Sequence, residues 1–121
     1  MKLRQVAKIL DAEAISGCDR DTDVATGCGC DLMSDVLTFA KPGGVLLSGL
    51  TNVQVVYSAS AAGVKAICFV RGKRPFEETI KLANRKKIAL LATKLPLFEA
   101  CGRLYKKGLK GGTELDAAPV K

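Results

Sequence analysis

The most reactive side chains of the chain gather in residues 27–36, which read GCGCDLMSDV. Cys28 and Cys30 would place two thiols on the same face of an extended segment. A thiolate is favoured near a helix start, and thiolates ligate zinc and iron–sulfur clusters. Such a centre needs further ligands, and the other cysteines are Cys18, Cys68 and Cys101. Cys68 falls within an apolar run and Cys101 on the apolar side of a helix, so packed, unreactive thiols are the alternative.

The same stretch could instead bind an anion. Glycines loosen the backbone, and Asp31 with Ser34 and Asp35 then opens a helix, whose first N–H groups favour negative charge. Two aspartates already supply that charge, so a capped structural turn is the competing interpretation. The candidate ligand-binding residues are Thr26, Gly27, Gly29, Asp31, Ser34, Asp35 and, at the next helix start, Asn52.

The chain lacks the residues that most kinds of catalysis require. It contains no histidine, which excludes His-dependent triads, His metal ligands and an imidazole general base. Neither common nucleotide fingerprint, Gly-x-x-x-x-Gly-Lys-Ser/Thr or Gly-x-Gly-x-x-Gly, stands at a strand-to-helix turn. The sequence therefore predicts a protein that is not an enzyme and has no cofactor.

Hydrophobic periodicity predicts an α/β fold in one domain over residues 1–110. Apolar runs predict strands at 14–17, 24–30, 45–47, 66–70 and 88–92, and apolar stripes predict helices at 3–10, 32–40, 52–63, 76–87 and 96–107. From residue 45 on, strands and helices alternate, so we expect a parallel or mostly parallel sheet with helices packed on its faces. The core-facing side of these helices is expected to include Leu37, Phe39, Phe76, Phe98 and Tyr105. Residues 111–121 lack apolar periodicity and are expected to form a disordered tail.

Charge is concentrated in the second half of the chain. The formal net charge is +7, with five Lys/Arg against seven Asp/Glu in residues 1–60 and fourteen against five in residues 61–121. A basic surface attracts nucleotides, nucleic acid or acidic partners, but the scarcity of aromatic residues argues against base-stacking nucleic-acid modules. The odd number of cysteines and the N-terminal sequence favour a cytoplasmic protein, and no apolar run is long enough to cross a membrane.

Several short motifs follow one another in a recognisable order. Residues 31–36 read DLMSDV and Asn52-Val53 opens a helix, an order that resembles the DRTGG domain family, where these motifs are Asp-Leu-Leu-Ser-Asp-Val and Asn-Ile. The sequence DTDVATG of residues 21–27 takes the place of the family's Asp-Arg-x-Val-Thr-Gly-Gly, with Thr22 at the Arg position, and Leu50 stands where the family often has His. Further matching residues are Ala66, Ile67, Gly72, Pro75, Phe98 and the run from Gly102 to Tyr105.

The resemblance implies a small non-catalytic α/β domain, related to the N-terminal domain of HPr kinase/phosphorylase and found fused to phosphotransacetylases or beside nucleotide-binding CBS domains. Stand-alone copies are associated with genes for anaerobe iron hydrogenases and serine/histidine kinases. We therefore expect a regulatory or interaction module that forms a homodimer, meets a kinase- or hydrogenase-associated protein and senses a small anionic, nucleotide-like ligand. Helix 52–63 and the final helix are the expected contact surfaces.

Two alternative functions stay open. The first is an iron–sulfur or redox accessory protein of a hydrogenase that acts through Cys28 and Cys30. The second is nucleic-acid binding through the basic second half, which would show a steep dependence on salt.

Overall fold

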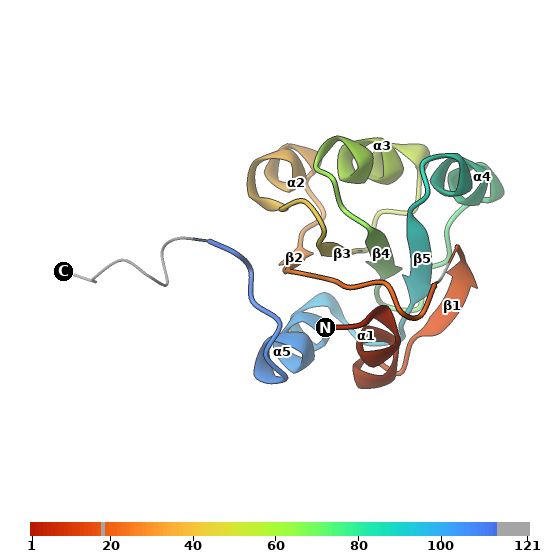
Figure 1. The fold of residues 1–121 in the computed structure, drawn as a ribbon. Helices are drawn as coiled ribbons and strands as arrows, with labels where there is room; N and C mark the ends of the chain where they lie inside the picture. The colour runs from red at the N-terminus through yellow and green to blue at the C-terminus, as the bar shows by residue number, and fades with distance from the viewer. Residues whose placement is uncertain (18, 114–121) are drawn as a thin grey trace.

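Within residues 1–17 and 19–113, which the computed structural model describes, five strands form one sheet between two layers of helices (Figure 1). The elements are α1 (Leu3–Ile9), β1 (Glu13–Ser16), β2 (Gly27–Gly29), α2 (Met33–Phe39), β3 (Val45–Ser48), α3 (Val53–Ala61), β4 (Ala66–Phe69), α4 (Glu77–Arg85), β5 (Ala89–Ala92) and α5 (Leu97–Lys106). The α/β class expected from the sequence is confirmed. Most of the expected tail, residues 114–121, lies outside the described residues.

The strands lie in the order β1-β5-β4-β3-β2. Neighbours from β2 to β5 are parallel, and β1 pairs with β5 in the antiparallel direction, with Glu13 opposite Ala92. The expectation of a mostly parallel sheet is therefore confirmed. The extended segment expected at 24–30 shortens to the three residues of β2.

Two apolar cores lie on the two faces of the sheet. All residues of β3, β4 and β5 are buried, as continuous apolar runs predict for strands covered on both sides. Successive side chains alternate between the faces. Val45 and Leu47 join the core that includes residues of α1 and α5, whereas Leu46 and Phe69 join the core under α2, α3 and α4.

The expectation that large apolar side chains of the helices face the core is wrong in five places. Phe98 is 88% exposed, and the others are about half exposed: Leu37, Phe39, Phe76 and Tyr105. Other residues of the same stripes take the buried positions: Val36 in α2, Leu82 and Ala83 in α4, and Ala100 and Leu104 in α5.

The helices change face between β4 and β5. Figure 1 shows α2, α3 and α4 above the sheet, and α1 and α5 below it. The connection after β4 therefore leads to one face, whereas the connection after the adjacent β5 leads to the other. Among the described residues no helix combines the length and the apolar character needed to span a bilayer.

Candidate functional site

A polar cluster ties together the carboxyl ends of β2, β3 and β4. Asp31 follows β2, and its Oδ1 accepts hydrogen bonds from the Ser48 hydroxyl at 3.0 Å and from the Gly49 N–H at 2.7 Å. Arg71, after β4, places Nη2 3.9 Å from Asp31 Oδ2. The buried Ser48 hydroxyl oxygen also accepts the Leu50 N–H at 3.2 Å. The Asp31 carboxylate thus contacts groups from the ends of two other strands. Hydrogen bonds to a charged acceptor of this kind are stronger than those between neutral groups.

Gly49 leaves the room that Arg71 needs. A Cβ at position 49 would lie 2.2 Å from Arg71 Nη2, so any other residue would push the guanidinium away from Asp31. The backbone of Arg71 adopts φ +58°, and its N–H donates to the Leu95 carbonyl at 2.9 Å. The next N–H, of Gly72, donates to the Thr93 carbonyl at 2.9 Å. The loops after β4 and β5 are therefore fastened to each other by backbone hydrogen bonds.

A pocket of about 490 Å³ lies beside these two loops, and we call it the switch pocket. In open α/β sheets, ligands bind outside the carboxyl ends of the strands where neighbouring connections lead to opposite faces, and β4 and β5 form such a point here. The polar part of its lining consists of Asp11, Glu13, Arg74, Thr93, Lys94 and Arg103. The Thr93 hydroxyl donates to the Leu10 carbonyl at 2.7 Å, which joins the end of β5 to the end of α1.

The switch pocket has an excess of positive charge. The Arg74 guanidinium pairs with the Glu13 carboxylate, which leaves Lys94 and Arg103 opposite the single carboxylate of Asp11. No ion pair within the described part of the chain involves Lys94 or Arg103. Guanidinium and ammonium groups in a pocket recognise phosphate or carboxylate. The arrangement is suited to binding an anion.

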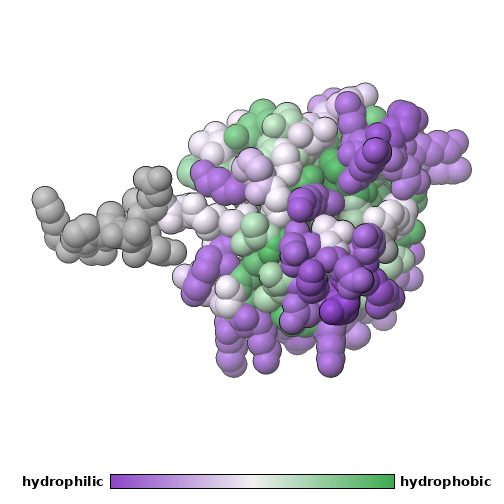
Figure 2. All heavy atoms as spheres, viewed as in Figure 1, coloured by the Kyte–Doolittle hydropathy of each residue, from purple (hydrophilic) through white to green (hydrophobic). Residues whose placement is uncertain are grey.

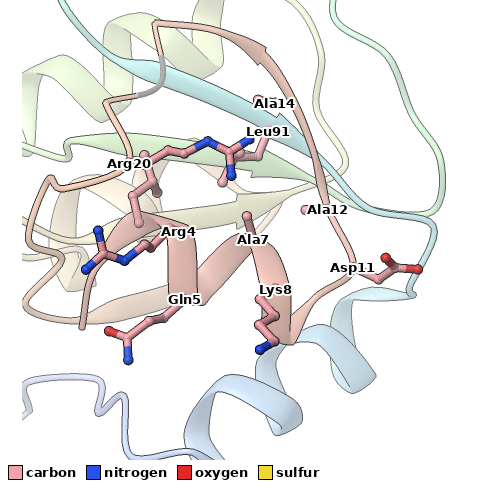
Figure 3. A pocket seen from close by; sticks show the side chains of 10 residues that line it. Arg4, Gln5, Ala7, Lys8, Asp11, Ala12, Ala14, Arg20 and Leu91 are labelled. Carbon is pink, nitrogen blue, oxygen red and sulfur yellow. The ribbon is translucent and has the colours of Figure 1, made fainter.

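A second hollow, of about 580 Å³, lies between α1 and the β1 edge of the sheet, and we call it the α1 pocket (Figure 3). Its polar side chains are Arg4, Gln5, Lys8, Asp11 and Arg20, and its apolar lining is Leu3, Ala7, Ala12, Ala14 and Leu91. Arg4 pairs with the Asp21 carboxylate on the loop before β2. Asp11 lines both pockets, so the two hollows adjoin at the turn between α1 and β1.

The structure divides the candidate ligand-binding residues of the sequence into two groups. Thr26 and Gly27 lie at the amino end of β2, where the Gly27 N–H donates to the Lys110 carbonyl at 2.9 Å. Gly29 ends the strand. The other four stand at the opposite, carboxyl edge of the sheet: Asp31, Ser34, Asp35 and Asn52. Contact of a ligand with any of these seven residues stays a prediction, and Thr26 and Gly27 belong to a different edge from the rest.

Local partners occupy several of these residues. The Asn52 side chain caps α3 by accepting the Gln54 N–H at 3.2 Å, as its place before an apolar stripe predicts. The capped turn, the competing interpretation of this stretch, is not formed through Asp31: the N-cap of α2 is Leu32, and no side chain caps this helix. Asp31 turns instead toward β3, because the Ser48 hydroxyl and the Gly49 N–H are both available there.

Cys28 and Cys101 have the environment of packed thiols. Burial raises the pKa of Cys28, and the neighbouring thiol of Cys30 adds to this effect; burial likewise raises the pKa of Cys101. The expectation of a favoured thiolate near the start of α2 is therefore wrong for Cys28. The Cys30 sulfur accepts the Leu32 N–H at 3.3 Å.

Within residues 1–17 and 19–113, no group of three or more Cys, Asp or Glu side chains is placed to hold a metal ion. Cys18, one of the cysteines that a cluster would need, lies outside the described residues. Cys68 is fully buried in β4, in agreement with its expected place in the core.

The cationic side chains of the switch pocket are absent from the sequence-based candidates. Arg74, Lys94 and Arg103 come from the loop after β4, the loop after β5 and α5. Arg103 belongs to the run Gly102–Tyr105 that resembles the DRTGG family, but the sequence did not single it out as a ligand contact. One signal is visible in the sequence: Arg74 and Lys94 each stand within four residues of the end of a buried apolar run in the basic half of the chain. Because the carboxyl ends of parallel strands share an edge, such residues are candidates for one site.

Comparison with known proteins gives a structural match without a sequence match. No family model matches the chain, and neither does any curated protein. A crystal structure of the CBS and DRTGG domains of the regulatory region of Clostridium perfringens pyrophosphatase, complexed with its activator diadenosine tetraphosphate, matches with a TM-score of 0.67 and 17% sequence identity. The match covers 85% of this chain and 45% of that one, so the chain spans less than half the length of the protein it resembles.

At 17% identity the similarity concerns the fold. The matched structure contains a DRTGG domain, and the motifs from Asp31 to Tyr105 resemble the same family. The chain thus has a DRTGG-like α/β fold, as the resemblance implied.

Proposed function

We propose that this chain is a non-catalytic regulatory module that binds a small anionic, nucleotide-like ligand in the switch pocket. The observation that carries the proposal is the excess of positive charge in a pocket at the point where the connections after β4 and β5 separate. The similar pyrophosphatase structure is itself a regulatory region bound to a nucleotide activator, which supports the class of function.

Lys94 and Arg103 are the proposed anion-binding groups. Lys94 stands in the loop after β5 and Arg103 near the end of α5, so the two cations enter the pocket from different elements. A phosphate bound between Lys94 and Arg103 would replace water at both cations. The planar guanidinium of Arg103 can donate hydrogen bonds to two phosphate oxygens at once. Arg74 already pairs with Glu13, so its contribution requires that pair to loosen.

Asp31 is proposed as a positioning residue for this pocket. Its carboxylate holds the Arg71 guanidinium, and the backbone of Arg71 is the start of the loop that carries Gly72 and Arg74. Ser34, Asp35 and Asn52 share the carboxyl edge with Asp31, and we retain them as candidate contacts for an extended ligand.

Isothermal titration calorimetry with ATP and with inorganic tripolyphosphate tests the function. We expect both probes to bind, and we expect Lys94→Gln with Arg103→Gln to weaken binding roughly tenfold or more, since a hydrogen bond to a charged group contributes about 1.5–3 kcal/mol. Arg85→Gln with Lys86→Gln is the matched control, because it also removes one arginine and one lysine, both exposed at the end of α4 and away from the pocket lining. Absence of binding, or an equal loss in this control variant, would contradict the proposal.

We also propose that the module self-associates through the outer surfaces of α2 and α3. Leu37, Phe39 and Tyr57 are each about half exposed, and Figure 2 shows apolar side chains over this side of the molecule. Exposed apolar groups of this kind mark protein interfaces. Sedimentation equilibrium should show a dimer that Phe39→Ser with Tyr57→Ser dissociates, whereas a monomer at all concentrations tested would count against it. A kinase- or hydrogenase-associated partner stays a prediction.

A further inference from the structure

We infer that the α1 pocket is a second subsite for the same ligand, and that this ligand is an extended small molecule with anionic groups at both ends. This inference rests on the proposed function of the switch pocket and adds the shape and charge distribution of what binds there.

The first argument is position. Asp11 lines both pockets, so the two hollows meet at the turn between α1 and β1, beside the Thr93–Leu10 hydrogen bond that joins β5 to α1. Cations stand on both sides of this turn, with Lys8 and Arg20 on one side and Lys94 and Arg103 on the other. A ligand with a single anionic group can use only one of these pairs.

The second argument is the state of the cations in the α1 pocket. Arg4 is paired with Asp21, whereas no ion pair of the described residues involves Lys8 or Arg20. Figure 3 shows the Arg20 side chain extended toward Leu91, and the Lys8 side chain on α1 on the other side of Ala7 from Arg20. Apolar side chains of the same lining, Ala7 and Leu91 among them, would contact the uncharged part of a ligand.

The charge of Asp11 should affect binding differently in one continuous site and in two separate sites. Its carboxylate is the one acidic group among the residues that line the α1 pocket, and it also lines the switch pocket. A polyanion that crosses the turn must pass this negative charge, whereas an anion confined to the far part of either pocket need not. Asp11 has φ +49°, a conformation that Asn adopts readily, so Asp11→Asn removes the charge with little backbone strain.

The test compares a short and a long probe, tripolyphosphate and inorganic polyphosphate of about 15 phosphates, at about 0.15 M salt, where distant charges are screened. The long probe should bind wild-type protein more tightly than the short one. Lys8→Gln with Arg20→Gln should remove this gain and leave tripolyphosphate affinity unchanged. Asp11→Asn should strengthen binding of the long probe about threefold, because a surface charge pair contributes up to about 1 kcal/mol. Arg85→Gln with Lys86→Gln, which also removes two positive charges, again reports the loss expected from net charge alone.

The outcomes separate this inference from the function on which it rests. Tripolyphosphate affinity can depend on Lys94 and Arg103 while the affinity of the long probe is unchanged by the substitutions at Lys8, Arg20 and Asp11. The inference of a second subsite is then wrong, and the proposed site in the switch pocket is supported. If tripolyphosphate affinity does not depend on Lys94 and Arg103, the proposed function itself fails. Tighter binding of a single-stranded oligonucleotide than of polyphosphate with equal charge would overturn the small-molecule inference in favour of nucleic acid.

Discussion

Phe69→Ala should lower the free energy of unfolding by about 3–5 kcal/mol, the usual loss for an aromatic side chain removed from a packed core. Phe69 is fully buried at the carboxyl end of the central strand β4 and belongs to the core under α2, α3 and α4. The same core contains small side chains, Ala59 and Ala83 among them, which are too short to fill the space that the ring leaves. Urea denaturation followed by circular dichroism measures the change.

Two companion variants keep this prediction testable. Phe69→Leu should cost about 1.5 kcal/mol or less, and it serves if the alanine variant does not fold. Phe98→Ala removes the same atoms from an 88% exposed position and should change the free energy of unfolding by no more than about 0.5 kcal/mol. If Phe98→Ala destabilised the protein as strongly as Phe69→Ala, the assignment of these two side chains to surface and core would be wrong.

Gly29→Ala should destabilise the protein by about 1–3 kcal/mol, although alanine is normally favoured over glycine in a strand. An added Cβ at Gly29 would lie 2.3 Å from Cys101 Sγ and 3.3 Å from Leu97 Cδ1, so β2 and α5 would have to move apart. Removing the sulfur should relieve this conflict. We therefore expect Gly29→Ala with Cys101→Ala to lose less stability than the sum of the single losses, with a coupling of about 1 kcal/mol.

The neighbouring Gly102 provides a control of opposite sign. An added Cβ there meets nothing within 4 Å, and the residue lies inside α5. Gly102→Ala should therefore stabilise the protein by up to about 1 kcal/mol through helix propensity. Additive losses in the double variant at positions 29 and 101 would mean that β2 and α5 do not pack as described.

The secondary structure could be predicted wherever one periodicity dominated. Residues 45–47, 66–70 and 88–92 are continuous apolar runs, and each became a strand buried on both faces. The buried face of each helix was harder to predict. Val36 and Leu37 are neighbours in one apolar stripe, and the pattern alone does not tell which of the two side chains is buried. The packing distance decides this, and in α2 the smaller side chain faces the sheet.

The candidate site could be predicted only where it was local. The cap of α3 depends on residues two apart, and the sequence placed it at Thr51 or Asn52; the structure shows Asn52. Asp31 accepts hydrogen bonds from groups 17 and 18 residues away in the sequence. A local sequence pattern cannot show that these distant donors, rather than the N–H groups of the nearby helix start, bind the carboxylate. The switch pocket depends on α5 passing to the face opposite α4, and the sequence of the β5–α5 connection resembles an ordinary strand-to-helix turn.

A titration of ¹⁵N-labelled protein with tripolyphosphate, followed by NMR, tests most directly whether the switch pocket binds anions. We expect the largest backbone amide shifts at Gly72 and Arg74 in the loop after β4, and at Lys94 and Leu95 in the loop after β5, because these residues line the pocket. Shifts confined to Gly29–Asp35, or no saturable shifts at all, would contradict binding in the switch pocket.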